Sequence, residues 1–488
     1  MWPLRLLCRT TFAFKSRQMK IKLLFTFMIA CAVSDANLLM VPLNFSTIQF
    51  AINASSDGDT VVVQPGTYYE NINFRGKKIV LTSLFYLAKD TSYICATIIN
   101  GSTPVHADTA SCVIFNHGED STTVLQGFTL TGGKGTKWAD VHGAGTYREG
   151  GAIITEFSSP IIQYNIISNN LVTNNTGVSS TGGGGIRSGD GNPIIRNNVI
   201  TYNQGRYGAG IVFNYCHGTV KNNVIAYNSG GQSYGGGGIW LTGTDTNTVV
   251  YVTNNTIANN HVTGGGTYGG KGGAIANLGV KADLHNNIVW GNTQALGGPV
   301  ATFGGSVVRM EYSDIQVAYA GIGNINALPV FSDTVIFLLA GSSPCIDAGD
   351  TSAINDDKIV SAGAAAFPSR GTKINDMGAY GGPGAFLMPV CGQQTGVRFY
   401  GNKNVILEIF PLPANDQAQI AFDLHAEQTV EFSLYDAGMR KLKVICQQLF
   451  APGQNSLSFD TSTLLPGLYF LECRTQDGIV IKKMTVNR

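Results

Sequence analysis

The chain has 488 residues, of which 13% are charged, and its formal net charge is +1. So small a charge imbalance argues against a nucleic-acid partner. The sequence holds 61 glycines without a Gly-X-Y period, which excludes collagen, and its 44% hydrophobic content argues against intrinsic disorder. A glycine-rich chain of this kind is typical of short strands joined by tight turns.

The N-terminal residues have the pattern of an export signal. Two lysines closely follow Met19, and an apolar run from Leu23 to Val33 leads to the small-residue site Ser34-Asp35-Ala36. The run is too short to span a bilayer, so residues 1–36 are interpreted as a cleaved signal peptide whose true start could be Met19. A lipoprotein anchor at Cys31 is the alternative. No later segment is apolar enough for a transmembrane helix.

A short amphipathic helix is expected over residues 46–56, with Ile48, Ala51 and Ile52 on one face. The segment after it reads Gly58-Asp59-Thr60-Val61-Val62-Val63-Gln64-Pro65-Gly66-Thr67-Tyr68-Tyr69-Glu70. This segment resembles the N-terminal cap and first coil of the pectate-lyase-like β-helix superfamily. The resemblance implies a right-handed parallel β-helix and, together with the repeats below, covers about residues 44–310.

Two motifs repeat through the middle of the chain. Asparagine-rich tetrads recur with spacings of 33, 25, 32 and 32 residues between their second asparagines, Asn165, Asn198, Asn223, Asn255 and Asn287. Glycine pairs or near-pairs precede five isoleucines, Ile153, Ile186, Ile211, Ile239 and Ile275. Four of these isoleucines lie 12 residues before a repeat asparagine; Ile239 lies 16 before, where residues 245–248 are interpreted as an insertion. A further asparagine follows each tetrad, at Asn169, Asn203, Asn228, Asn259 and Asn292.

These periods favour a solenoid of short strands over helical repeats, because glycine and asparagine are poor helix formers. Three strands of about five residues with their turns need roughly 20–30 residues per coil. Identical residues of successive coils then stack, and asparagine suits such a ladder because it tolerates left-handed turns and can hydrogen-bond its neighbours. The predicted fold class is all-β, a right-handed parallel β-helix over residues 37–310 followed by a small C-terminal β-sandwich.

Three motifs follow the repeats: Gly323–Phe331, Ser343–Asp350 and Asp376–Pro383. They resemble the choice-of-anchor Q tail of bacterial surface β-helix proteins, apart from Gly381, where that family often has glutamate. The resemblance implies that residues 311–396 form the last, irregular coil and its C-terminal cap.

The last segment, residues 397–488, alternates polar and apolar residues like a small β-sandwich. Pro411–Asp416, Asp436–Gly438, Leu464–Tyr469 and Lys482–Arg488 resemble the type IX secretion C-terminal sorting domain, with Leu412 in place of the usual asparagine. The resemblance implies a Bacteroidota-type cell and the type IX secretion machinery as the partner of residues 397–488. The expected location is secreted or attached to the outer-membrane surface.

Seven of the nine cysteines remain after cleavage at Ala36, an odd number without a disulfide framework or a zinc motif. Two bridges are candidates, Cys95 with Cys112 and Cys446 with Cys473. Buried free thiols are the alternative.

One outward column of the helix is a candidate binding surface. If the repeat isoleucines point inward, the residues after them point outward, and these include Arg187 and Trp240. Two positions further along lies Asn214. Arg187, Asn214 and Trp240 are therefore predicted to bind a sugar through a cation, an amide and an aromatic platform. An ordinary solvated face is the alternative.

The candidates for catalysis are charged residues on neighbouring coils: Arg187, Asp190, Arg206, His217 and Lys221. A polysaccharide lyase needs a cation at the uronate carboxyl and a base near the C5 proton, whereas a hydrolase needs two facing carboxylic acids. No two candidates share a defensible column, so solubilising surface charge is the alternative. Whether the protein is an enzyme stays open.

No cofactor is required by the sequence, although one group of aspartates could bind calcium through oxygen ligands: Asp347, Asp350, Asp356, Asp357 and Asp376. Turn-capping is the alternative role for these side chains.

Two functions are compatible with these features. The first is non-catalytic binding of glycans or other surfaces through the helix face. The second is a polysaccharide lyase acting on an acidic, uronate-containing polymer. The ligand, the oligomeric state, and whether the protein is released or stays on the cell are left open.

Overall fold

The computed structural model describes residues 36–391, apart from 233, 244–248, 266 and 361–362, and residues 407–486, apart from 412, 425, 437–440 and 476–477. The predicted signal peptide, except for Ala36, and the predicted insertion at 245–248 lie outside the described residues. Within the described parts, no helix combines the length and the apolar character that a bilayer-spanning helix needs.

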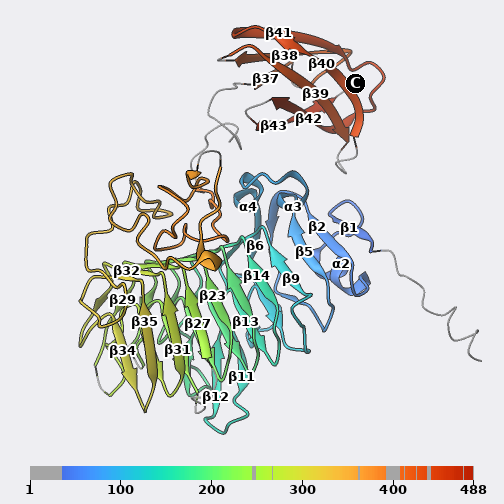
Figure 1. The fold of residues 1–488 in the computed structure, drawn as a ribbon. Coiled ribbons are helices and arrows are strands. Elements are labelled where there is room, and N and C mark those ends of the chain that lie inside the picture. The colour runs from blue at the N-terminus through green and yellow to red at the C-terminus, as the bar shows by residue number, and fades with distance from the viewer. Residues whose placement is uncertain are drawn as a thin grey trace, which may run out of the picture. The chain divides into compact units, whose positions relative to one another are not determined.

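Residues 38–315 form a parallel β-helix, as the repeats predicted (Figure 1). Equivalent strands of successive coils pair in parallel and build three long sheets, which we call faces A, B and C. Face A runs from β1 (Leu38–Val41) to β35 (Val307–Glu311), face B from β3 (Gly66–Tyr68) to β36 (Asp314–Ile315), and face C from β4 (Ile72–Asn73) to β34 (Val300–Phe303). The structure adds a fourth sheet of two-residue strands, from β16 (Leu171–Val172) to β33 (Thr293–Gln294).

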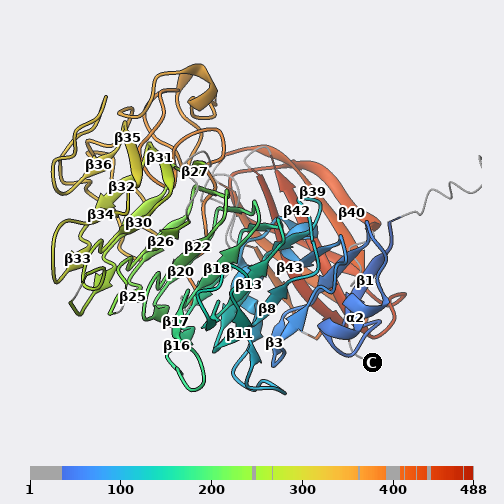
Figure 2. The same ribbon diagram turned by 90° about the horizontal axis from the view of Figure 1, so that it is seen from below.

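One coil shows how the sequence makes this path, and Figure 2 shows the coils stacked one after another. The chain passes through β19 (Ile194–Arg196) on face A, β20 (Val199–Thr201) on face B, β21 (Gln204–Gly205) in the short sheet and β22 (Ile211–Asn214) on face C. Branched apolar side chains from each of the three long strands point inward, and they form one continuous core with those of the other coils. Burial of these side chains is the main stabilising contribution to the solenoid.

Helix α2 (Ile48–Ala54) covers the first coil. The Thr47 side chain caps its N-terminus by accepting a hydrogen bond from the Phe50 N–H. Ile48, Ala51 and Ile52 are completely buried, as the predicted amphipathic pattern required. The helix therefore closes the apolar interior at this end.

The five repeat isoleucines each begin a strand of face C and lie directly beside one another in register: Ile153, Ile186, Ile211, Ile239 and Ile275. The turns that precede these strands use glycine for its conformational freedom. Gly183 and Gly208, for example, have φ angles of +57° and +48°, in the left-handed region that glycine enters without a steric penalty. The glycine and isoleucine landmarks thus fix the corner and the core of the same coil.

The second asparagine of each tetrad forms an interior ladder at the corner between faces A and B. Asn223 is completely buried, and its Oδ1 accepts hydrogen bonds from the backbone N–H of Asn198 (2.9 Å) and from Asn198 Nδ2 (3.0 Å). Its own Nδ2 donates to the carbonyl oxygens of Ile195 and Lys221. Each buried amide therefore satisfies backbone groups that the corner would otherwise leave unpaired.

The first asparagine of each tetrad has a different role. Asn197, Asn222, Asn254 and Asn286 have φ angles between +52° and +55°, and their side chains point away from the interior ladder. Asn222 Nδ2, for instance, donates to the carbonyl oxygens of Ala379 (3.1 Å) and Gly381 (2.7 Å), which belong to a later segment of the chain. The second asparagine of each pair stabilises the corner, and the first forms hydrogen bonds with the later segment that covers the corner.

A second interior ladder follows face B and contains Asn170, Asn203, Asn228, Asn260 and Asn292. Asn169 and Asn259 were predicted to belong to this series, and both predictions are wrong by one residue, since Asn170 and Asn260 occupy the ladder. Asn169 and Asn259 instead occupy left-handed turn positions, where Tyr202 and Tyr227 stand in other coils.

Residues 326–391, the covering segment, run back along face B instead of continuing the solenoid (Figure 1, orange). The last coil itself is closed by a short bridge between Asp314 and Ile325. Beyond it, Phe337, Ala379, Tyr380 and Met388 pack on the outward side chains of face B, which include Val199 and Val224. The covering segment thus shields a second, outward apolar surface of the helix.

Cys391 ends the covering segment and forms a disulfide with Cys95 of α4 (Ser92–Ala96), 296 residues earlier. The predicted bridge from Cys95 to Cys112 is therefore wrong, and Cys112 is a buried free thiol.

The predicted bridge between Cys446 and Cys473 is also wrong. Both cysteines face Phe432, one from each side of the strand that separates them, and both are free. Residues on two strands that are separated by a third lie about 9–10 Å apart, which is beyond the reach of a disulfide.

Residues 407–486 form an antiparallel β-sandwich, described here by itself. One sheet contains β37 (Leu407–Phe410), β38 (Gln417–Leu424) and β41 (Gly453–Asp460); the other contains β40 (Lys441–Phe450), β39 (Gln428–Asp436), β42 (Gly467–Thr475) and β43 (Gly478–Val486). Alternate side chains of both sheets, such as Phe422, Phe432 and Leu471, meet in a shared core.

Candidate functional site

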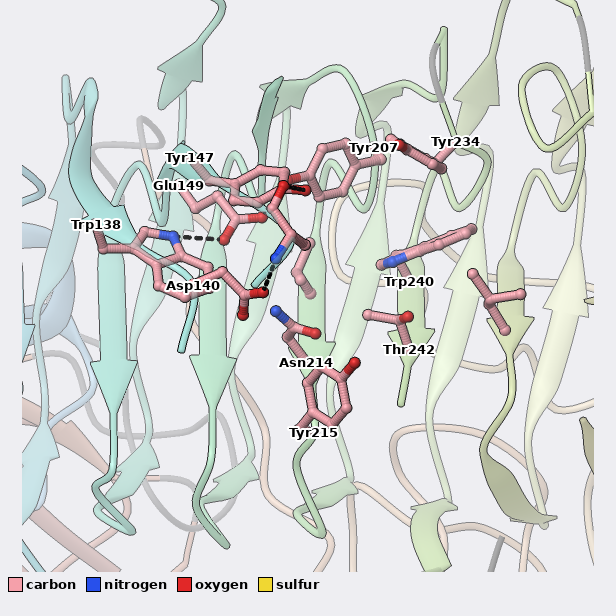
Figure 3. A pocket seen from close by; sticks show the side chains of 13 residues that line it. Trp138, Asp140, Tyr147, Glu149, Tyr207, Asn214, Tyr215, Tyr234, Trp240 and Thr242 are labelled. Carbon is pink, nitrogen blue, oxygen red and sulfur yellow. Dashed lines mark hydrogen bonds between the residues drawn. The ribbon is translucent and has the colours of Figure 1, made fainter. Parts of the chain in front are cut away.

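The outward column of face C is covered, not solvated. Arg187 and Trp240, the two notable members of this column, have exposed fractions of 0% and 3%. The alternative of an ordinary solvated face is therefore wrong for these two residues. The reason is a set of loops and a hairpin that lie over this part of face C and enclose a cavity (Figure 3).

The hairpin consists of β11 (Gly135–Ala139) and β12 (Thr146–Glu149), which pair in antiparallel register with Trp138 opposite Tyr147. It is joined to the body because β12 also pairs in parallel with β17 (Ser180–Gly182). Its loop is anchored at the other end, where His142 stacks on Tyr215 with ring centroids 3.6 Å apart. This hairpin is an insertion into the coil pattern and supplies one wall of the cavity.

Arg187 lies beneath the wall that the hairpin forms. Its guanidinium carbon is 3.6 Å from the centroid of the Trp138 ring, and its Nε is 3.2 Å from Glu149 Oε2. Its Nη1 pairs with Glu156 and donates to the Thr155 carbonyl oxygen. A Cβ atom on Gly189 would collide with the guanidinium, so glycine at that position makes room for it. Arg187 is thus an enclosed structural cation and does not face the cavity.

Aromatic rings dominate the walls of the cavity, which has a volume of about 180 Å³. The Tyr234 ring lies 5.4 Å from Tyr207 and 5.6 Å from Trp240, measured between centroids. Trp138, Tyr147 and Tyr215 add further rings on the hairpin side. The volume is close to that of the roughly 150 Å³ cavity known to hold one benzene molecule, so one six-membered ring can enter.

Two carboxylates line the cavity among these rings. Glu149 is buried and saturated: it accepts hydrogen bonds from Trp138 Nε1 (2.7 Å) and from the Tyr207 hydroxyl, and burial raises its pKa despite the nearby Arg187. Asp140 is 9% exposed, and its Oδ2 accepts a hydrogen bond from the Ala144 N–H (2.8 Å). Its Oδ1 is buried and has no hydrogen-bond partner among the described residues. Asp140 therefore has acceptor capacity that a ligand could use.

The three predicted ligand-binding residues gather at this cavity. Asn214 and Trp240 line it, and Arg187 lies directly behind it, two strands away from Trp240 in the register of face C, with Val212 between them. Val212, Thr242 and Leu278 also line it and occupy repeat positions on face C. The lining residues of the hairpin and of the loops were not predicted, because they lie outside the repeats that align the coils. A signal was present, since a tyrosine followed by glycine recurs at Tyr207, Tyr234 and Tyr268.

The remaining catalytic candidates do not converge. Asp190 Oδ1 lies 2.9 Å from His142 Nε2. Arg206 follows β21 and is half-buried, whereas His217 lies in the turn after β22 and is exposed. Lys221 ends β23 (Thr219–Lys221) on face A beside Arg196, and burial followed by the charge of Arg196 lowers its pKa. The structure therefore provides no shared acid and base pair from this set.

The predicted calcium group caps turns of the covering segment. Asp376 accepts hydrogen bonds from the backbone N–H groups of Asp347 and Arg370, and Asp357 accepts from those of Asp376 and Gly382. Asp347 and Asp350 cap turns through Thr372 and Ser352 in the same way, whereas Asp356 pairs with Lys373. Among the described residues, no group of three or more acidic, histidine or cysteine side chains is arranged to hold a metal ion.

Asp357 should make the stability of the covering segment depend on pH. Burial, followed by the charge of Asp376, raises the pKa of Asp357 to about 8, and burial raises that of Asp376 to about 7. The unfolded values are near 4. Because the folded state then holds these protons more tightly, the stabilisation that these two groups contribute is complete below about pH 4 and is lost as pH rises towards 8. The thermal midpoint of the wild-type protein should therefore fall between pH 5 and 8.

The variant Asp357→Asn should show a smaller fall over the same interval. Asp356→Asn is the matched control and should follow the wild type. Equal pH dependence in all three proteins would contradict the assignment, and a rise in the wild-type midpoint at pH 8 with millimolar calcium would instead favour a metal site.

Comparison with known proteins identifies the C-terminal sandwich. Residues 408–487 match the family model described as a secretion system C-terminal sorting domain. A search of curated proteins found no match to the chain. A sorting domain of this type directs export by the type IX secretion system, so the protein is secreted or attached to the outer-membrane surface.

Proposed function

We propose that this exported protein binds a carbohydrate, without cleaving it, through the aromatic cavity over face C. The single observation that carries the proposal is the lining itself: six aromatic residues surround a space that fits one ring, with acceptor groups between them. Sugar rings pack their C–H faces on aromatic side chains and donate hydroxyl hydrogens to carboxylates and amides, and mostly apolar pockets with a few placed polar groups are typical binding sites. We also propose that the β-helix is related to the pectate-lyase-like superfamily and that residues 311–396 are a choice-of-anchor Q tail.

The lyase alternative has less support. Lyase chemistry requires a cation against the uronate carboxylate in the transition state. Arg187 is the nearest cation, but it is fully buried and engaged by two glutamates behind the cavity wall. Among the described residues that line the cavity, none is a lysine or an arginine.

Glycan-array binding of the purified protein tests the proposal. Tyr234→Ala should weaken binding to every retained glycan by at least about tenfold, equivalent to about 1.4 kcal/mol, because the half-buried Tyr234 ring contributes to the wall. Tyr202→Ala is the matched control, since that tyrosine is exposed and stacks on Tyr227, away from the cavity. Absence of binding to any glycan, or equal loss in both variants, would overturn the proposal. Unsaturated products from uronate polymers would support the lyase instead.

A further inference from the structure

The side chains in and around the cavity include more acidic than basic groups. Asp140 and Glu149 line it, and Glu156 pairs with Arg187 behind it. Asp190 pairs with His142, whose ring stacks on the lining residue Tyr215. Arg187 is the only guanidinium in this group, and it is shared between Glu149 and Glu156. The region thus holds four carboxylates and one buried guanidinium, which contacts two of them, so the site has an excess of negative charge.

The Asp140 carboxylate makes this excess available to a ligand. Its side chain is more than nine-tenths buried, it lines the cavity, and its Oδ1 has no partner among the described residues. A buried carboxylate oxygen without a donor is costly, and a charged N–H donor offsets that cost better than a neutral hydroxyl does. The position therefore calls for a positively charged hydrogen-bond donor.

The surrounding rings favour the same ligand. The faces of tryptophan and tyrosine attract substituted ammonium groups, and combined aromatic and carboxylate sites are typical of organic cation recognition. The same negative charge acts on the neighbouring tyrosine hydroxyls. Burial is the largest cause that raises the pKa of Tyr147, and Tyr234, Glu149 and Asp140 raise it further. Burial likewise raises the pKa of Tyr215, and the charges of Asp140 and Asp190 raise it further.

We infer that the cavity selects a sugar ring carrying a protonated amino group, prefers it to a neutral ring, and rejects a uronate. This inference rests on the proposed carbohydrate-binding function and deepens it by naming the ligand class. Asp140 is the residue that we assign to the ammonium group, and the aromatic walls hold the ring.

Calorimetric titration of the full exported chain with four tetrasaccharides tests the inference. The probes are tetramers of glucosamine, N-acetylglucosamine, glucose and glucuronic acid, at pH 5.5 and low salt. The glucosamine tetramer should bind at least about tenfold more tightly than the glucose tetramer, and the glucuronic acid tetramer more weakly than either. Raising the ionic strength to about 0.5 M should reduce the glucosamine preference, because it rests on charge.

Asp140→Asn should reduce the glucosamine preference to less than about threefold, because binding of the glucosamine tetramer weakens more than binding of the glucose tetramer. Asp120→Asn, which removes an exposed carboxylate paired with Lys78, is the control for unspecific attraction and should leave the preference intact. Equal binding of glucosamine and glucose, or tightest binding of glucuronic acid, would overturn the inference and leave the proposed function standing. Failure of all four tetramers to bind, together with an empty glycan array, would overturn both.

Discussion

Replacement of Arg187 by methionine is expected to lower the free energy of unfolding by about 3–5 kcal/mol. The guanidinium is completely enclosed and compensates the buried carboxylate of Glu149 and the largely buried one of Glu156. Removal of the cation leaves both carboxylates unpaired in a low-dielectric site, and it also removes the packing on Trp138. Urea unfolding followed by tryptophan fluorescence measures the effect, since two of the four tryptophans, Trp138 and Trp240, line the neighbouring cavity.

The control for this variant is Arg309→Met. Arg309 also contacts two acids, Asp283 at 3.6 Å and Glu311 at 2.6 Å, but its side chain is 56% exposed. Exposed ion pairs contribute little, so this substitution should leave the unfolding midpoint almost unchanged. If the cost of Arg187→Met comes from unpaired charge, the triple variant Arg187→Met, Glu149→Gln, Glu156→Gln should recover much of the lost stability. Equal effects of the two arginine substitutions would contradict the burial argument.

The regular part of this molecule could be predicted from the sequence because a solenoid repeats its signal in every coil. Ile186 and Asn198 keep the same separation as Ile211 and Asn223, and the structure places each pair on the same core and corner positions. A stacking fold relies on such fixed phase, since a residue that leaves the register loses contacts with both neighbouring coils. The alternation of the sorting domain is a second periodic signal, and it predicted the sandwich correctly.

Features that occur once carry no periodic signal. The hairpin that contains Trp138 and Glu149 interrupts the coil pattern, and its pairing with the body depends on contacts between distant residues. The bridge from Cys95 to Cys391 spans 296 positions, which no local spacing can indicate. These elements cover outward faces of the helix, and they bury a column that strand alternation alone places on the surface.

The candidate site was therefore predicted only in part. Trp240 and Asn214 were chosen because they lie one and three residues after repeat isoleucines, and both line the cavity. Arg187 was placed in the correct column, but its role changes from a ligand contact to an internal counter-ion because Glu149 arrives from the hairpin. Side-chain direction follows from strand alternation, whereas exposure depends on what the rest of the chain lays over the strand.

Replacement of Asn223 by alanine is expected to lower the free energy of unfolding by about 3–5 kcal/mol, because several buried groups lose their partners together. The backbone N–H of Asn198 loses its acceptor, and the carbonyl oxygens of Ile195 and Lys221 lose the amide donor. The side-chain link from Asn223 Nδ2 to Asn255 Oδ1 is also lost, whereas the backbone N–H of residue 223 still donates to that oxygen. Hydrogen-bonded chains in a low-dielectric interior strengthen one another, so a break in the middle of the ladder affects both sides.

Hydrogen exchange of the backbone amides, combined with urea unfolding, distinguishes this effect from a general loss of packing. Faster exchange should be confined first to the corner residues of the coils that flank Asn223, since each coil contacts mainly its neighbours. Asn174→Ala, at an exposed position in a loop, is the control and should change neither the exchange pattern nor the unfolding midpoint. Asn223→Asp should also destabilise the protein, because a carboxylate of similar shape cannot donate to the two carbonyl oxygens and brings a buried charge. A stable Asn223→Ala variant with unchanged exchange would show that the interior ladder contributes shape alone, and that the β-branched core is sufficient to hold the coils in register.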